Sequence, residues 1–205
     1  MCQSRGANSL MIPGAAARVL DVFQARPEAD VVYAGHRNLA ADGKVTDASK
    51  PVAEESALFR SDNHLGICVM IRRRVYESGL RYDPAIRAAE DLDFFVRAFD
   101  AGFRFARCEG EPLLFFRQHD QAGSVTQNAR QNLETARILA RREKSFWKRW
   151  DIYAYRYGEA AYRYRREENW RSAISVTAAG LRRAPLSPKL WKQLLSSILR
   201  IQPRA

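Results

Sequence analysis

The sequence predicts an α/β segment followed by an all-helical tail. Up to about residue 127, short β-branched or aromatic runs alternate with helical apolar spacing, and turn residues separate them. Beyond that point only helical spacing is found. Charge divides at the same place, because residues 129–205 hold 18 Lys and Arg against 6 Asp and Glu, in a chain of net charge +11. We therefore expect two domains, residues 1–127 and 128–205.

Length and composition are those of a globular protein. The 205 residues include 46% hydrophobic residues, which are enough to fill a core. No run reaches the roughly 18 apolar residues of a membrane-spanning helix, and the N-terminal stretch lacks the features of a signal peptide. Cys2, Cys68 and Cys108 are odd in number and show no CxxC spacing. We expect reduced thiols, two of them buried, and a cytoplasmic location.

The first predicted elements are a helix and a strand. Val19, Leu20 and Phe23 lie between two prolines and predict a helix of about three turns over residues 13–27. The β-branched and aromatic residues of 30–34 predict a strand.

A long loop and a second strand come next. Residues 48–65 have no clear period and are expected to form a functional loop. The apolar run 67–71 predicts a buried strand, which leads into a short helix over 72–76 that ends at Gly79.

The most informative segment is residues 88–102. Its apolar residues recur at helical spacing, and Gly102 is the expected stop. The first turn carries Glu90 and Asp91. Carboxylates are favoured at any helix N-terminus, so an ordinary acidic first turn is the alternative to a functional pair. Two strand-like pieces follow, over 103–107 and 113–117.

The order of these pieces resembles the acceptor-side half of a GT-A, Rossmann-like glycosyltransferase domain of family 2. The matching strings cover roughly residues 10–127. They are Met11-Ile12-Pro13-Gly14, residues 27–33, 66–73 and 79–83, Ala89-Glu90-Asp91-Leu92-Asp93 with Arg97, and Phe116-Arg117-Gln118-His119 with Ser124. The expected fold is thus an incomplete GT-A half-domain followed by an all-α tail.

The resemblance implies catalytic roles on the acidic helix. Asp91 matches the general base, which takes the proton of the acceptor hydroxyl as its oxygen attacks the sugar. Glu90 would position the acceptor or the base. Arg97 is grouped with the acceptor site, where it would brace the helix or a neighbouring carboxylate.

Three further residues receive weaker roles from the resemblance. Asn63 and His64 fall on the loop where relatives shape the acceptor pocket. His119 matches a position that approaches the metal or the diphosphate in some relatives, although a lone histidine is more often simply a satisfied polar residue.

The donor side of the family pattern is missing. A full domain binds Mg²⁺ or Mn²⁺ through an Asp-x-Asp motif, whereas Ser4–Leu10 contains no carboxylate. We expect this chain alone to be inactive and to bind a nucleotide sugar poorly. A truncated gene, a degenerate copy and one half of a split enzyme are three open explanations.

The expected function is inverting transfer of a sugar from a nucleotide-sugar donor to a saccharide or lipid-linked acceptor, as in polysaccharide biosynthesis, once a donor half is supplied. The alternative is a catalytically inactive fragment that acts as a helical protein-interaction module.

The tail resembles a single tetratricopeptide hairpin over residues 157–185, with a plain helical hairpin as the competing interpretation. An amphipathic helix near Trp191 follows. The basic residues could meet an anionic membrane surface at the inner face, or the helix could simply pack as a terminal helix. Specific nucleic-acid binding is not expected, because no recognition motif accompanies the charge.

Overall fold

The protein is a mixed α/β chain that divides into two compact units. The computed structural model describes residues 2–3, 9–40, 43–45, 65, 68–86, 90–117 and 129–203. The first unit is drawn from Met1–Phe59, Asn63–Tyr82 and Phe94–Gln121. The second is drawn from Arg60–Asp62, Asp83–Asp93 and Ala122–Ala205. The long loop expected at 48–65 lies outside the described residues, apart from the buried Leu65.

A four-stranded mixed sheet forms the centre of the first unit. Its strand order is β1-β5-β3-β6, in which β3 runs parallel to β6 and antiparallel to β5. Every residue of β3 and β5 is buried, as expected for strands covered on both faces. The strands are β1 (Cys2–Gln3), β3 (Val31–Ala34), β5 (Cys68–Ile71) and β6 (Phe105–Cys108).

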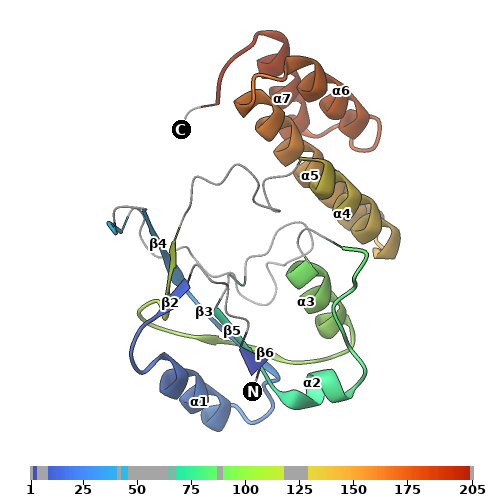
Figure 1. The fold of residues 1–205 in the computed structure, drawn as a ribbon. Helices are drawn as coiled ribbons and strands as arrows, with labels where there is room; N and C mark the ends of the chain where they lie inside the picture. Colours follow the sequence, from blue (N-terminus) through green and yellow to red (C-terminus); the bar gives the residue numbers. More distant parts are fainter. Residues whose placement is uncertain are drawn as a thin grey trace. The chain divides into compact units, whose positions relative to one another are not determined.

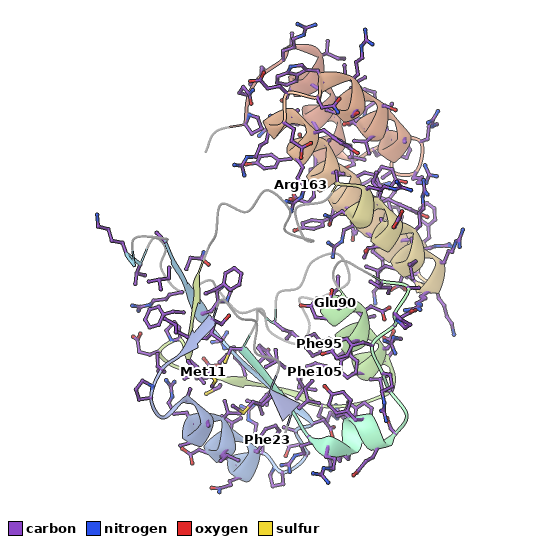
Figure 2. The ribbon with its side chains drawn as sticks, in the orientation of Figure 1. Met11, Phe23, Glu90, Phe95, Phe105 and Arg163 are labelled. Atoms are coloured by element: carbon purple, nitrogen blue, oxygen red, sulfur yellow. The ribbon has the colours of Figure 1, made fainter. Side chains whose placement is uncertain are left out.

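Helices α1 (Ala15–Ala25) and α3 (Glu90–Asp100) pack on opposite faces of this sheet (Figure 1). On one face, Val19 and Phe23 of α1 join a core that includes Val32 of β3. On the other face, Phe95 of α3 meets Phe105 of β6 edge to face, with ring centroids 6.3 Å apart (Figure 2). Alternate side chains of a strand point to opposite faces, so each strand contributes to both cores.

A second sheet continues the parallel pairing beyond a break at Gly35. Its order is β2-β7-β4, with β7 parallel to β4 and antiparallel to β2. The register passes from Ala34↔Cys108 to His36↔Leu114, so residues 109–113 of the neighbouring strand segment lie opposite Gly35. The strands are β2 (Ser9–Met11), β4 (His36–Leu39) and β7 (Leu114–Arg117).

The loop over residues 109–113 is tied to α1 by one arginine. Arg18 donates to the carbonyl oxygens of Glu109 at 2.6 Å and Glu111 at 2.9 Å. Gly110 lies between them with φ 90°, a conformation that L side chains rarely adopt. A Cβ there would also stand 2.9 Å from Arg18 Nη2. Any other residue would be strained at this position, which therefore favours glycine.

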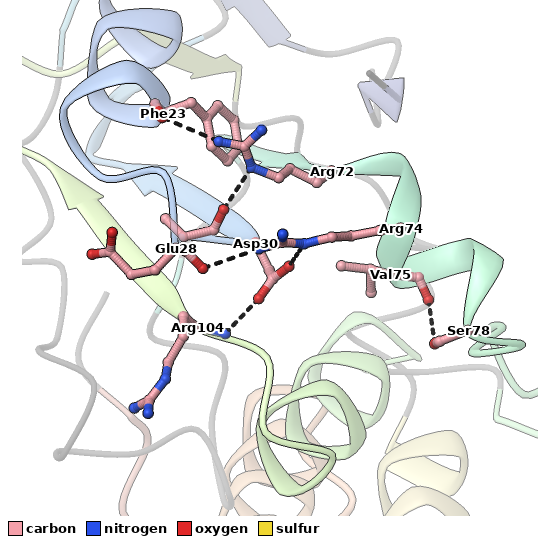
Figure 3. A network of polar contacts seen from close by, with 9 residues as sticks. Phe23, Glu28, Asp30, Arg72, Arg74, Val75, Ser78 and Arg104 are labelled. Carbon is pink, nitrogen blue, oxygen red and sulfur yellow. Dashed lines mark hydrogen bonds and ion pairs between the residues drawn. The ribbon is translucent and has the colours of Figure 1, made fainter.

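Asp30 organises the base of the central sheet (Figure 3). It is buried, and its Oδ2 accepts the backbone N–H of Arg104 at 2.9 Å while its Oδ1 pairs with Arg74 Nε. Its carbonyl oxygen accepts the N–H of Arg72 at 2.8 Å, at the start of helix α2 (Arg73–Glu77). The guanidinium of Arg72 caps the carbonyl of Ala29 and lies 4.6 Å from the Phe23 ring centroid. The carboxylate of Asp30 thus joins the start of β3 to the approach to β6 and to α2, and its backbone carbonyl holds the residue that follows β5.

Four helices form the body of the second unit: α4 (Ala129–Arg142), α5 (Phe146–Arg166), α6 (Trp170–Leu181) and α7 (Pro188–Ile198). The last three have side-chain caps, since Ser145, Asn169 and Ser187 each accept the N–H three residues on. Helix α5 packs against each of the other three. The helical tail is therefore confirmed, whereas its tetratricopeptide ancestry stays a prediction.

Close packing in the second unit depends on Gly180 in α6. A Cβ at Gly180 would stand 2.8 Å from Tyr157 Cβ of α5 and 3.1 Å from Leu190 Cδ1 of α7. The three helices therefore approach one another at this glycine.

Most predicted elements are confirmed. The helix between the two prolines is α1, the run at 67–71 is β5, and the acidic helix is α3, which ends before Gly102 at φ 88°. Cys68 and Cys108 are buried and free, as expected. No helix in the described part of the chain combines the length and the apolar character needed to cross a bilayer.

Candidate functional site

Helix α3 carries the candidate catalytic pair, and local signals set both of its ends. Its first turn contains Glu90, Asp91 and Asp93, whose charges favour the helix N-terminus. At the other end, Phe103 N–H donates to the Ala98 carbonyl and Gly102 N–H to that of Phe99. These two bonds around a left-handed glycine form a Schellman motif, which stops the helix.

Aromatic packing anchors the middle of α3 in the first unit. Phe94 is fully buried and stacks on Tyr82, with ring centroids 4.6 Å apart. Phe95 and Phe99 both contact Phe105 of the central sheet. Burial of a Phe side chain stabilises a fold by about 1.5–3 kcal/mol, so the helix is held firmly.

The paired carboxylates sit in different surroundings. Glu90 is exposed at the N-terminal end of α3 (Figure 2). Partial loss of water raises the pKa of Glu90, its own backbone N–H opposes that rise, and the charge of Asp91 adds to it. Asp91 is half-buried, and its Oδ1 accepts the N–H of Leu92 at 2.7 Å. The pair therefore holds one carboxyl that is more easily protonated than an isolated glutamate.

Asp93, two residues further on, belongs to a different arrangement within the second unit. It is buried and pairs through Oδ1 with Arg142 Nη1 of α4. The other terminal nitrogen of Arg142 pairs with Asp83. Burial alone would lower the pKa of Arg142, but the hydrogen bonds to Asp93 and Asp83 outweigh it and raise that pKa. This Asp83–Arg142–Asp93 clamp fastens the end of α4 to the first turn of α3.

Arg97 points to the loop that precedes α3. Its Nη2 donates to the carbonyl oxygen of Arg81 at 2.7 Å, and Arg81 in turn donates to the carbonyl of Tyr76. This contact agrees with a bracing role. Acceptor binding by Arg97 stays a prediction.

The remaining predicted site residues cannot be placed. Asn63, His64 and His119 lie outside the described residues. Within the ranges that the structure describes, no group of three or more His, Cys, Asp or Glu could hold a metal ion.

Sequence reasoning missed the clamp. Asp93 is turned about 200° around the helix from Asp91, so helical spacing alone predicts that Asp93→Asn is much milder than Asp91→Asn. Its burial and its pairing with Arg142 make it a poor neutral control. No spacing in the sequence could have revealed this, because Arg142 lies 49 residues away.

No protein-family model matches the chain, and no curated protein matches it.

Proposed function

We propose that this chain supplies the acceptor-side part of an inverting glycosyltransferase of the family 2 type, with Asp91 as the general base. The observation that carries the proposal is the position of Asp91. It is half-buried in the first turn of a firmly anchored helix, next to a glutamate of raised pKa. The mixed sheet before α3 and the order of the matching strings support it as well.

The chemistry requires one proton acceptor at this place. The acceptor hydroxyl oxygen attacks the anomeric carbon of a nucleotide sugar and forms a new C–O bond. The bond from that carbon to the diphosphate oxygen breaks, and the diphosphate leaves with the electron pair. The hydroxyl proton passes to the Asp91 carboxylate, and attack from the opposite side inverts the configuration. Glu90 would hold a neighbouring hydroxyl of a saccharide or lipid-linked acceptor.

Donor binding is assigned to no residue described above. In family 2 enzymes Mg²⁺ or Mn²⁺ neutralises the leaving diphosphate, but the described residues do not fit such a metal, since they contain no set of three ligands. The proposal leaves the nucleotide and its cation to another part of the enzyme.

The test restores transfer and then removes the base. The donor-binding half of a family 2 glycosyltransferase, with its Asp-x-Asp motif, is fused before the full chain, and Asp91→Asn is compared with the parental fusion. Loss of a general base should lower kcat by about 10²- to 10⁴-fold. The stability change should stay within about 1 kcal/mol, because only a helix-end charge is lost.

Asp100→Asn is the matched control, since Asp100 is an exposed carboxylate at the other end of the same helix. It should transfer sugar at the parental rate. A fusion in which Asp91→Asn keeps near-parental kcat would refute the assignment. A folded fusion that binds donor and transfers to no acceptor would count against the family proposal and favour the inactive, protein-interacting alternative.

A further inference from the structure

The C-terminal helix α7 leaves a continuous apolar stripe uncovered. Leu190 is fully buried against α5 and α6, and Ser197 is also buried. On another side of the helix the residues at i, i+4, i+7 and i+8 are exposed, and this spacing places them on one face. They are Trp191 (49%), Leu195 (58%), Ile198 (56%) and Leu199 (67%). We call these four residues the α7 stripe.

Exposed apolar residues continue the α7 stripe beyond both ends of the helix. Leu186, just before α7, and Ile201, just after it, are both exposed. The indole Nε1 of Trp191 donates to the Pro185 carbonyl at 2.8 Å, so the one polar atom of that ring already has its hydrogen bond within the protein. The ring can therefore enter an apolar environment without leaving a donor unsatisfied.

The segment that carries the stripe has charges of a single sign, while Glu159 and Glu168 outside it contact Lys189 and Gln202. Residues 169–205, which include α6 and α7, contain seven Lys and Arg and no Asp or Glu. Lys192 follows Trp191 on the exposed side of the helix, and Arg200 ends it at φ 51°. Among the described residues neither side chain has a hydrogen bond or an ion pair. Both are available to an outside anion.

We propose that the α7 stripe docks this protein on an anionic lipid surface, with the stripe at the headgroup boundary and Lys192 and Arg200 reaching lipid phosphates. An interfacial helix needs an exposed apolar face with a Trp and neighbouring cations, and α7 presents each of these features. The inference goes beyond the proposed sugar transfer and does not depend on it.

Charge argues against a second copy of the chain as the occupant. Two copies meeting at this face would bring their positive residues together with no acidic residue of 169–205 to oppose them. Nucleic acid would neutralise the cations but would leave the α7 stripe in water. An anionic bilayer satisfies the apolar and the charged features together.

The experiment measures sedimentation of the full chain with vesicles of phosphatidylcholine, with and without phosphatidylglycerol. We expect binding to the anionic vesicles that weakens as salt is raised, because charge attraction is screened over about 10 Å at 0.1 M and about 3 Å at 1 M. Equal binding to both vesicle types, or binding that ignores salt, would overturn the proposal.

Two variants separate the apolar and charged parts. Leu195→Gln with Leu199→Gln should weaken anionic vesicle binding by about tenfold or more, since burial of one Leu side chain is worth about that factor. Lys192→Gln with Arg200→Gly should weaken it by roughly thirtyfold, at about 1 kcal/mol for each of the two cations. Both pairs are exposed, so circular dichroism should show parental folding, and glycine also suits the left-handed backbone at 200.

Matched controls identify the surface. Leu20→Gln changes an exposed leucine of α1, and Lys144→Gln removes an exposed cation of the tail outside 169–205. Both should bind vesicles like the parental chain. Phe146 and Trp147 form another exposed apolar pair, at the start of α5. If their replacement by Gln abolishes binding while the α7 variants retain it, the proposal is wrong.

Self-association supplies the last outcome. Light scattering measures the mass of the chain at rising concentration. If the mass increases, and if Leu195→Gln with Leu199→Gln returns it to that of the monomer, a second copy occupies the α7 stripe and lipid docking is refuted.

Discussion

A methyl group added at Gly180 tests the contact on which the second unit depends. In Gly180→Ala the new Cβ would stand 2.8 Å from Tyr157 Cβ, 3.1 Å from Leu190 Cδ1 and 3.2 Å from Tyr157 Cδ1. Optimal carbon contacts are about 3.5–4.0 Å. Tyr157 Cβ is attached directly to the backbone of α5, and Leu190 is fully buried. Helix α6 must therefore move away from α5 or α7.

The magnitude follows from two opposing effects. Overpacking of a tight core costs about 1–3 kcal/mol. Alanine is favoured over glycine in a helix interior by about 0.8–1 kcal/mol, and less near the helix end where Gly180 lies. We expect Gly180→Ala to lower the free energy of unfolding by about 1–2 kcal/mol.

Gly158→Ala is the matched control. Gly158 is also buried and helical, but the three atoms nearest to its Cβ would all belong to the stem of Lys189, with Cε at 2.9 Å. That side chain is partly exposed and can turn aside, at the loss of an ion pair with Glu159 worth at most about 1 kcal/mol. The helix-propensity gain offsets this loss. Gly158→Ala should be neutral within about 1 kcal/mol.

Urea unfolding, followed by the helical circular-dichroism signal, measures the free energy of unfolding of both variants and of the parental chain. A parallel shift of the midpoint at constant slope gives the stability change. If Gly180→Ala is as stable as Gly158→Ala, the three helices do not meet at Gly180 as described, and the packing argument fails.

Three further predictions concern the clamp, the thiols and a helix end. Arg142→Ala should lower the free energy of unfolding by about 1–3 kcal/mol, because the buried Asp93 and the nearby Asp83 both lose the guanidinium that they share. The exposed Arg141→Ala should change it by less than about 0.5 kcal/mol, and equal effects in urea would contradict the clamp. Burial, and secondarily the neighbouring Cys108, raises the pKa of Cys68 from 9.0 to about 11, so alkylation by iodoacetamide below pH 9 should be at least about a hundredfold slower than in the unfolded chain. An alkylation rate of Cys68 equal to that of the unfolded chain would refute its burial. The same pKa shift contributes stability that is complete below pH 9 and is lost as pH rises toward 11, which unfolding curves across that range would detect. Glu168→Gly should raise the free energy of unfolding by up to about 1 kcal/mol, because Glu168 holds φ 56° between α5 and α6, and a loss of stability in urea would show that this turn is not strained.

The candidate site was only partly predictable. Glu90 and Asp91 were found because an acidic first turn before an apolar helical period is a local pattern. Their surroundings were not predictable. Burial is the largest cause of the raised pKa of Glu90 and cannot be read from the sequence, although the charge of the neighbouring Asp91 adds to it. The pairing of Asp93 with Arg142 does not follow from sequence neighbours either.

The sequence by itself determined where helices begin and end. The apolar period of α3, the glycine after it, and Ser187 with Pro188 at the start of α7 act within a few residues, so their physics is readable along the chain. Strand β4 escaped prediction because it contains His36, Arg37 and Asn38, which are poor strand signals. It exists through its parallel pairing with β7, more than 70 residues away.

Tertiary structure alone decided which charges are buried and which apolar faces stay open. Asp30 is buried because two distant segments, at residues 72–74 and at Arg104, bring it donors. Some of the periodic apolar residues of α7 are buried and others face water, and their spacing in the sequence does not distinguish the two sets. Burial depends on what other segments bring to a surface, and those contacts arise only when the whole chain has folded.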